Sequence, residues 1–324
     1  MESGCLFDIA VVVVTFNAES YIEQCLQSIF THLPAGYLST IIVVDNSSAD
    51  KTLELVCKLK EKGKSLKIVA LEENIGFGPA NNLAMNVVKA RYYVLVNMDA
   101  WFIADSIGAA IQTMENSPSI AVCGLPLVFP NGDPQTYAYG FSSWKKWLLQ
   151  ILGIRTLVSR ALFIPGVARC ISKMPFGKTF VLSQKRHRFD FGSISPAEFD
   201  SNLQDVDWVC GAAMILEGGF VKSSRGFDQN IFLYGEDEDL CITAHDLGRR
   251  VVVIDVPPLV HVFGWGKNQF NSKVARLKYT SLKYFISKNI TKTFDRLLMR
   301  LLLPLYVYGW RRLYMAIGAE VEKG

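Results

Sequence analysis

The chain has 324 residues, of which half are apolar and a fifth are charged, so it can bury a sizeable core and its composition argues against disorder. Its seven cysteines are odd in number, widely scattered and free of any CxxC pair, which argues against a disulfide framework and against a zinc site. The opening sequence MESGCLFDIA lacks the basic and long apolar segments of a secretory signal, so we expect a cytoplasmic protein.

The formal net charge of +4 is distributed unevenly along the chain. Residues 144–188 hold ten Lys/Arg and no Asp/Glu, and residues 270–316 hold ten Lys/Arg and the single acid Asp295. The rest of the chain is therefore net acidic. This segregation indicates a basic surface that meets something anionic, while the acidic part holds the chemistry.

Short β-branched runs alternate with amphipathic segments over the first 125 residues. Such alternation predicts a parallel sheet covered by helices. The predicted strands are residues 9–15, 40–44, 66–71 and 92–96, and the predicted helices are residues 19–31, 50–62, 79–90 and 104–116.

The regular alternation stops after a predicted strand at residues 121–129 and a turn at residues 131–134. Later elements are predicted strands at 207–216 and 250–255, a helix at 238–247, and C-terminal helices at 273–288 and 294–315 that break or kink around Pro304. We therefore expect four parts. They are an N-terminal half (1–136), a basic aromatic insertion (137–205), a second half of the core (206–266) and a basic helical extension (267–324).

Polar side chains follow the first two predicted strands. Thr15 and Asn17 stand at the end of the first strand, and Asp45 stands at the end of the second. Because the carboxyl ends of parallel strands line the ligand crevice, these side chains should be neighbours, with donors and acceptors suited to a base and a ribose. The alternative is that residues 45–47 only cap the next helix.

The segment at residues 73–82 follows the third strand and opens a helix. Glycine lets the backbone approach a ligand and a helix N-terminus favours anions, so Asn74 and Gly76 are candidate ligand-binding residues. The spacing GFGPAN does not fit the dinucleotide-binding fingerprint, and a plain loop is the alternative.

Asp99 directly follows an apolar strand. A pyrophosphate in a mainly acidic core needs a countercharge, which a divalent metal held by carboxylate oxygen supplies, so Asp99 is a candidate metal ligand. The alternative is an Asp that caps the following helix. His261 is far from other His or Cys in the sequence, so as a metal ligand it would need Asp99 as its partner; a structural role is the alternative.

Four acidic residues, Glu236 to Asp239, stand in succession at the start of a helix. They repel one another, and the helix dipole alone rarely calls for four, so one of them could be a general base with a raised pKa. Asp237 and Asp239 would point to nearly opposite sides of a helix, and we expect them to have different roles. A solvated acidic cap is the alternative.

Seven motifs occur in order: VVTFN, IIVVDNSSADKT, ENIGFGPANN, YVLVNMDA, VDWVCGAAMIL, GFDQNIFLYGEDEDLC and the late His261. Together they resemble the inverting family-two glycosyltransferases of the GT-A fold, especially the rhamnosyltransferase-like members. The resemblance spans residues 8–266. It implies an α/β fold of GT-A type, a Rossmann-like mixed sheet flanked by helices, in which residues 1–136 bind the nucleotide sugar and residues 206–266 bind the acceptor and carry the catalysis.

The resemblance also implies roles for individual residues. Asp45 would bind the base or ribose with Thr15 and Asn17 nearby, and the segment from Asn97 to Asp99 would be the DxD-type metal site, with Asn97 in the place of its first acid. Asp237 would be the catalytic base, supported by Glu236. His261 would help to hold metal or phosphate, and Trp208 and Gly211 would shape the acceptor side.

These roles predict a metal-dependent enzyme that transfers a sugar with inversion, using Mg²⁺ or Mn²⁺. Rhamnose from dTDP-rhamnose is favoured by the resemblance, while UDP- and GDP-sugars remain open. The expected setting is bacterial cell-surface polysaccharide or glycolipid assembly. The alternative is a degenerate protein that binds a nucleotide sugar without turnover, and we expect no nucleic-acid partner because the core is acidic and lacks a recognisable motif for it.

The two basic segments interleave cations with Trp and Leu. They include Trp144, Lys145, Lys146, Trp147, Arg155, Arg160, Arg169, Trp310, Arg311 and Arg312. Such helices can lie on an anionic membrane surface, which predicts a lipid-linked acceptor at the inner face of the cell membrane. Helices that pack on the core and expose a basic face are the alternative.

Overall fold

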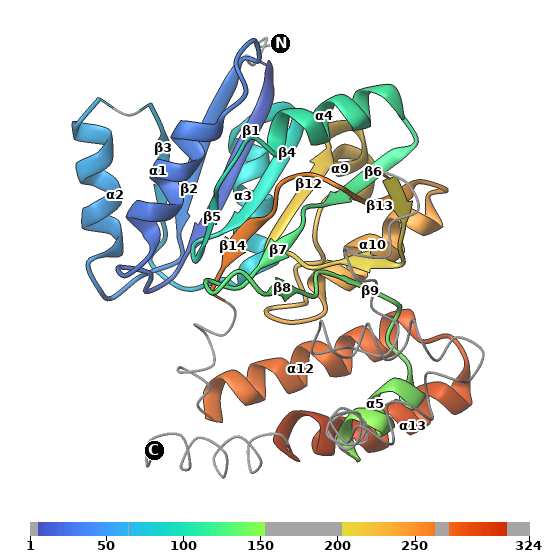
Figure 1. Ribbon diagram of the computed structural model, residues 1–324. Helices are drawn as coiled ribbons and strands as arrows, with labels where there is room; N and C mark the ends of the chain where they lie inside the picture. Colours follow the sequence, from blue (N-terminus) through green and yellow to red (C-terminus); the bar gives the residue numbers. More distant parts are fainter. Residues whose placement is uncertain (1–5, 64, 153–202, 263–271, 310–324) are drawn as a thin grey trace, which may run out of the picture.

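The computed structural model describes residues 6–63, 65–152, 203–262 and 272–309. Its main feature is a mixed sheet of eight strands in the order β10-β13-β6-β12-β4-β1-β2-β3, with helices on both faces (Figure 1). The prediction of a mixed α/β sheet flanked by helices is confirmed.

The N-terminal half alternates strands and helices as predicted. Its elements are β1 (Leu6–Thr15), α1 (Ile22–His32), β2 (Ser39–Asp45), α2 (Thr52–Glu61), β3 (Lys67–Ala70), α3 (Phe77–Val87), β4 (Lys89–Asn97) and α4 (Ile107–Asn116). Strands β4, β1, β2 and β3 are parallel. The central strands are rich in valine and isoleucine and are buried on both faces, because helices cover both sides of a parallel sheet.

The second half completes the sheet with β6 (Ile120–Gly124), β10 (Leu203–Asp205), β12 (Ala213–Glu217) and β13 (Arg250–Ile254). Strand β12 runs antiparallel between β4 and β6, which makes the sheet mixed. Helix α9 (Gly218–Ser224), which was not predicted, follows β12, and α10 (Glu236–Asp246) begins two residues earlier than expected.

Two predicted strands are wrong as single elements. The chain predicted as residues 121–129 divides into β6 and β7 (Leu127–Val128), because Pro126 cannot donate to a ladder and the chain passes to another sheet. The chain predicted as residues 207–216 divides into β11 (Trp208–Val209) and β12. The division falls at Gly211, whose N–H donates to the carboxylate of Asp237 instead of to a neighbouring strand.

A second sheet of four short strands lies beside the first, in the order β5-β14-β7-β8. It adds β5 (Ala100–Phe102), β8 (Pro134–Gln135) and β14 (Leu259–His261) to β7. A further pair joins β11 to β9 (Ala138–Tyr139). The second sheet brings Gln135 and His261, which are far apart in sequence, next to the chain that follows Asp99.

Helices α5 (Trp144–Ile151), α12 (Ser272–Asn289) and α13 (Thr293–Pro304) form a separate layer, which Figure 1 shows below the sheet. After Pro304 the chain continues as the π-helical turn η2 (Leu305–Gly309), so the predicted break at this proline is confirmed. The layer has its own core, composed of Trp147, Ile231, Ala275, Leu282, Phe285, Ile286, Met299, Leu303 and Val307. Within the four described ranges, no helix is both long enough and apolar enough to cross a membrane.

The predicted insertion 137–205 is described only at its ends, residues 137–152 and 203–205. Arg155, Arg160 and Arg169 lie outside the described residues, as do Trp310, Arg311 and Arg312. The packing of α5 on α13 shows that the first part of the insertion belongs to the C-terminal helical layer.

Candidate active site

Thr15 and Asp45 end neighbouring strands and lie directly opposite each other in the parallel register. Both are buried, and Asp45 accepts hydrogen bonds from the backbone N–H and the hydroxyl of Ser48 at 3.0 and 2.6 Å. Asp45 therefore braces the loop after β2; it does not cap α2, which begins at Thr52. Among the described residues, the Thr15 hydroxyl is buried without a hydrogen-bond partner, so it can still bind a ligand at this edge.

Asn17 lies in the loop after β1 with φ of 51°, in the left-handed region that asparagine tolerates better than most residues. Its Oδ1 accepts a hydrogen bond from the N–H of Ala49 at 2.8 Å, and its own N–H donates to the Ser48 hydroxyl at 2.9 Å. The loops after β1 and β2 are thereby joined. The expected proximity of Thr15, Asn17 and Asp45 is confirmed.

Asn46 holds the third loop to the second. Its side chain accepts from the N–H of Ile75 at 2.9 Å and donates to the carbonyl of Gly76 at 3.1 Å. Asn74 accepts from the N–H of Gly76 at 3.0 Å, and Gly76 has φ of 96°, which disfavours any residue with a Cβ. A Cβ at Gly76 would stand 2.5 Å from the carbonyl oxygen of Phe232. Sequence analysis did not assign Asn46 a bridging role, although it directly follows Asp45.

Asn97 ends β4, and Asp99 follows it in the turn before β5. The carboxylate of Asp99 lies 3.4 Å from Nε2 of His261, and both side chains are buried. Asp99 therefore does not cap α4, and the expected pairing with His261 is confirmed as a contact. Met98 lies between Asn97 and Asp99 in the sequence. Its sulfur accepts a hydrogen bond from the N–H of Phe16 at 3.1 Å, which ties the end of β4 to the end of β1.

Gln135 orients the His261 ring. Its Nε2 donates to the His261 carbonyl at 3.3 Å, and because a carbonyl can only accept, Oε1 is the amide atom that faces Nδ1, at 2.6 Å. Nδ1 is therefore the donor to Gln135, and Nε2 is the ring atom that faces Asp99. Sequence analysis missed Gln135, because only the second sheet brings it to His261.

The chemistry of this pair fits a divalent cation. A carboxylate oxygen and an imidazole nitrogen face each other, and the second ring nitrogen is held by an amide, as metal-bound histidines usually are. The described ranges contain no group of three or more His, Cys, Asp or Glu that could hold a metal by themselves. Two protein ligands nevertheless suffice for a metal that is completed by substrate phosphates and water.

The four acids at the start of α10 have different environments. Glu236, Glu238 and Asp239 are buried, so the alternative of a solvated acidic cap is wrong. Asp237 accepts the N–H of Gly211 at 3.2 Å on one oxygen and the N–H of Glu238 at 2.9 Å on the other. Glu238 accepts both the N–H and the hydroxyl of Ser142, and burial raises its pKa to about 7.

Glu236 and Asp237 form a coupled pair. Burial raises the pKa of both carboxyl groups, and the charge of Asp237 raises that of Glu236 further, to about 8. The Oε2 atom of Glu236 is buried and has no hydrogen-bond partner within the part of the chain that is described. Glu236 therefore keeps its proton near neutral pH. Asp237 is better stabilised as a carboxylate, since both of its oxygens accept backbone N–H groups.

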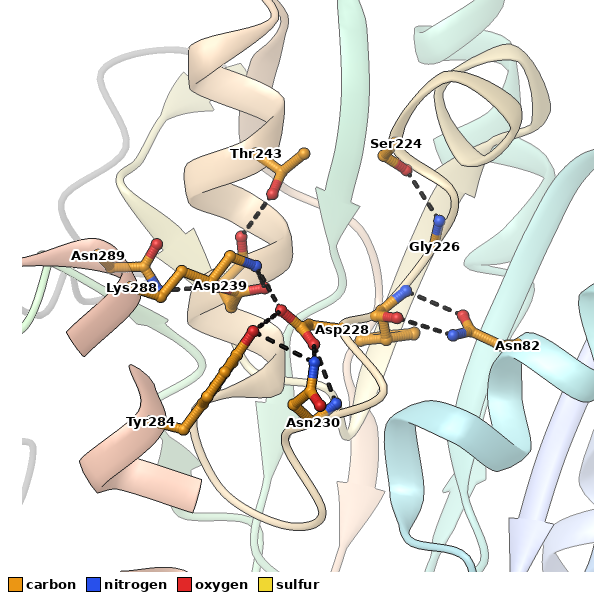
Figure 2. A network of polar contacts seen from close by, with 11 residues as sticks. Asn82, Ser224, Gly226, Asp228, Asn230, Asp239, Thr243, Tyr284, Lys288 and Asn289 are labelled. Carbon is orange, nitrogen blue, oxygen red and sulfur yellow. Dashed lines mark hydrogen bonds and ion pairs between the residues drawn. The ribbon is translucent and has the colours of Figure 1, made fainter. Parts of the chain in front are cut away.

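Asp239 lies in a network of polar contacts with α12 (Figure 2). Lys288 donates to Asp239 at 2.8 Å and to Asp228 at 2.7 Å, and Asn289 donates to the other oxygen of Asp239 at 2.7 Å. Burial opposes ionisation of Asp228, but hydrogen bonds from Lys288 and Asn230 outweigh it and lower its pKa to about 2. The different roles expected for Asp237 and Asp239 are thus visible as different partners.

Charged groups at the end of β4 and at the start of α10 act on Cys210, which lies between β11 and β12. Burial, together with the charges of Asp237, Glu236 and Asp99, raises the pKa of this thiol to about 12. The charge of Asp99, after β4, and the charges of Glu236 and Asp237, at the start of α10, therefore both raise the pKa of the same thiol. The N–H of Asn97 also donates to the Ala212 carbonyl at 2.9 Å, next to the Gly211 N–H that donates to Asp237 at 3.2 Å, so the end of β4 and the start of α10 lie beside the same backbone segment.

Trp208 and Gly211 lie on the segment that faces α10. The Trp208 ring stacks on Tyr139 with centroids 4.4 Å apart, and its indole N–H donates to the Gly140 carbonyl at 3.1 Å. Gly211 leaves room for the Phe77 ring, since a Cβ there would lie 3.1 Å from Cε1 of Phe77. Gly211 thus contacts the candidate base through its N–H, whereas Trp208 packs within the β9–β11 pair.

The sheet order and this site define the class: a GT-A glycosyltransferase fold. A mannosyltransferase from Pyrobaculum calidifontis, solved with GDP-Man and Mn²⁺, is similar with a TM-score of 0.53 and 16% identity over 94% of this chain and 70% of that chain. Residues 1–349 of Staphylococcus aureus TarS, solved with UDP-GlcNAc, are similar with a TM-score of 0.51 and 17% identity over 93% and 71% of the two chains. Similarity at these identities shows the fold alone.

The family is shown by sequence. The family model described as Glycosyl transferase family 2 matches residues 10–180, which is more than half of the chain, and the chain belongs to this family. The poly(ribitol-phosphate) beta-N-acetylglucosaminyltransferase TarS of Staphylococcus aureus (strain Mu50) is 29% identical over 129 residues, which are 39% of this chain and 22% of TarS. The chain spans half or less of the length of the curated relatives it matches.

Proposed function

We propose that the protein transfers a sugar from a nucleotide-diphosphate sugar to an acceptor hydroxyl, with inversion at the anomeric carbon. The observation that carries the proposal is the position of Asp237. Its carboxylate is held by the N–H groups of Gly211 and Glu238, has a raised pKa, and lies near the end of β4, where the Asn97 N–H donates to the Ala212 carbonyl beside Gly211. A carboxylate made more basic by burial is suited to removing a proton.

Asp237 is the proposed general base in a single displacement. One of its oxygens takes the acceptor hydroxyl proton while the acceptor oxygen forms a bond to the anomeric carbon. The bond from that carbon to the diphosphate oxygen breaks, and the diphosphate leaves with the electron pair. Each Asp237 oxygen retains a second lone pair beside its backbone hydrogen bond, so the proton can be accepted without loss of those contacts.

Asp99 and His261 are the proposed metal ligands, and Gln135 holds the His261 ring. A divalent cation bound there, Mg²⁺ or Mn²⁺, would neutralise charge on the diphosphate leaving group. Thr15, Asn17 and Asp45 are the proposed contacts to the nucleoside, with Asn74, Gly76 and Asn97 lining the diphosphate side. Glu236 is proposed to support Asp237 by keeping its own proton.

The proposed donor is dTDP-rhamnose, and this choice depends only on the resemblance of the sequence motifs to those of rhamnosyltransferase-like enzymes. The similar solved structures hold UDP-GlcNAc and GDP-Man, so UDP- and GDP-sugars are the competing donors. Trp208 and Gly211 are proposed to shape the acceptor side. The four-part division at residues 136, 205 and 266 is likewise part of the proposal.

The proposed acceptor is a glycan or lipid-linked glycan of the bacterial cell surface, used at the inner face of the cell membrane. Relatives named as a teichoic acid poly(glycerol phosphate) polymerase and as a putative teichuronic acid biosynthesis glycosyltransferase support this setting. The five cysteines of the described ranges, which are buried or half-buried, are all free thiols, which is compatible with a reducing compartment.

A donor screen tests the proposal. The purified chain is incubated with Mg²⁺ or Mn²⁺ and dTDP-, UDP- or GDP-sugars, with and without membrane lipid extract, and release of nucleoside diphosphate is measured. We expect release from one donor, and we expect EDTA to abolish it. Equilibrium binding of a donor without any release, under all these conditions, would favour the alternative of a nucleotide-sugar-binding protein that has lost turnover.

A further inference from the structure

The outer face of α13 and η2 exposes a row of large apolar side chains, which we call the α13 stripe. Its members and their exposed fractions are Phe294 (65%), Leu297 (56%), Leu301 (63%), Leu305 (54%) and Tyr308 (40%). Successive members are three or four residues apart, so they share one face of the helix. The stripe spans 15 residues, or about 20 Å at the usual rise of a helix.

The fold uses only the two ends of this face, where Phe294 meets Trp144 and Tyr308 lies 5.9 Å from Tyr279, and the three leucines between them stay more than half exposed. The other side of α13 and η2 packs into the helical layer through Met299, Leu303 and Val307, which are buried. A helix at the surface of a globular protein needs only one apolar face. A second, exposed row of this size marks a surface that contacts something apolar.

The helical layer that carries the stripe is basic, and Lys145 and Arg300 are cations close to the stripe. Residues 144–151 and 272–304 hold ten Lys/Arg and one acid, Asp295. Lys145 lies 5.7 Å from the centroid of the Trp144 ring, and that ring meets the Phe294 ring edge-on at 6.4 Å. Arg300 is exposed and immediately precedes Leu301. Leucine and aromatic side chains between basic residues fit an apolar layer beneath a layer of anionic groups.

The stripe lies on the active-site side of the molecule. Figure 1 shows α12, α5 and α13 below the sheet, on the side where β1 and β2 end, with α13 on the far side of α12 from the sheet. Lys288 and Asn289 of α12 hold Asp239, two residues from the candidate base. A surface that touches the stripe is therefore held at a fixed position relative to Asp237.

We propose that the α13 stripe and its nearby cations dock this protein onto the surface of an anionic lipid bilayer, with α13 lying in the plane of the interface. Exposed apolar side chains and nearby cations would bring about this docking, and neither depends on the proposed transferase activity.

Vesicle sedimentation tests the proposal without donor or acceptor. The full chain is mixed with vesicles of phosphatidylcholine alone, or with about one third phosphatidylglycerol, at low and high salt. We expect binding to the anionic vesicles that weakens with salt. We expect the double variant Leu297→Ser, Leu301→Ser to bind at least tenfold more weakly, because the two leucines no longer leave water for the lipid.

A matched control is the double variant Leu38→Ser, Ile103→Ser, which changes two residues that are each 53% exposed and belong to the sheet domain. It should bind vesicles like the parent. Lys145→Gln and Arg300→Gln should each weaken binding to anionic vesicles by about fivefold and leave the apolar contact intact. All variants except Arg300→Gln should keep the parent's thermal midpoint, because the altered side chains are exposed; Arg300 also donates to the Ser287 hydroxyl at 2.8 Å, so the midpoint of Arg300→Gln is measured beside its binding.

Three results would overturn the proposal. The parent could fail to bind anionic vesicles, or the stripe variant could bind as well as the parent. The parent could also form a dimer that the stripe variant converts to a monomer, with no vesicle binding by either. That last result would assign the stripe to a second copy of the chain.

Discussion

Replacement of Lys288 by methionine is predicted to destabilise the fold and to disturb the catalytic helix. Lys288 neutralises Asp228 and Asp239, whose side chains are 14% and 3% exposed, at 2.7 and 2.8 Å (Figure 2). Removal of one partner from a buried pair costs about 3–5 kcal/mol. Because the Lys288 side chain is 36% exposed, water screens part of the interaction, and we expect a loss of about 2–3 kcal/mol in unfolding free energy.

Thermal and denaturant unfolding measure that loss, and the expected fall in melting temperature is about 4–6 °C. Asp239 and Asp237 share one helical turn, so we also expect kcat to fall by about tenfold, within the range that small misplacement of a catalytic group can cause. Lys283→Met is the control, since Lys283 is exposed on the same helix. Asp239→Asn should recover part of the loss when it is added to Lys288→Met, because it removes the uncompensated charge.

The reasoning fails if Lys288→Met unfolds within 0.5 kcal/mol of the parent, the range of an ordinary surface change. It also fails if the added Asp239→Asn brings no recovery. Either result would mean that the contacts between α10 and α12 do not fix the start of α10.

Three further predictions concern the active site. Gln135→Leu should weaken Mn²⁺ binding by about 10- to 100-fold, measured by calorimetry, because His261 loses the partner that orients its ring; unchanged affinity would show that the ring is held by other means. Gly76→Ala should destabilise the fold by about 2–3 kcal/mol, measured by denaturant unfolding, since φ is positive and the Cβ would meet the Phe232 carbonyl; a neutral effect would refute the close approach. Burial raises the pKa of Glu238 from 4.5 to about 7, so as pH rises the unfolded chain loses the Glu238 proton before the folded chain does. The free energy of unfolding should therefore fall by a few kcal/mol between about pH 4.5 and about pH 7. Glu238→Gln should flatten that dependence, and an unaltered pH profile would contradict the assignment.

The strand ends of the N-terminal half could be predicted, because the buried strands of a parallel sheet are continuous apolar, β-branched runs that are easy to identify in the sequence. Apolar runs ending in Thr15, Asp45 and Asn97 place polar residues at one edge by topology alone. The pairing of Asp99 with His261 could also be predicted, since no other His or Cys stood near enough in sequence to serve.

The supports of the site could not be predicted in the same way. Gln135 reaches His261 through strands of two or three residues, which are too short to show a period. The contact of Lys288 with Asp239 joins residues 49 apart through the packing of two helices, and neither residue differs in sequence from an ordinary solvated charge. The start of α10 was placed too late because Gly235, with φ of 99°, ends the preceding loop just before Glu236.

The most direct test of the central claim is a comparison of Asp237→Asn with Asp246→Asn, an exposed acid on the same helix. Single-turnover rates and equilibrium donor binding are measured for both variants, with the donor and metal found in the screen. The account predicts that Asp237→Asn lowers kcat by about 10²- to 10⁴-fold and leaves donor affinity unchanged, while Asp246→Asn matches the parent. A kcat for Asp237→Asn within a few-fold of the parent would contradict the assignment of the base.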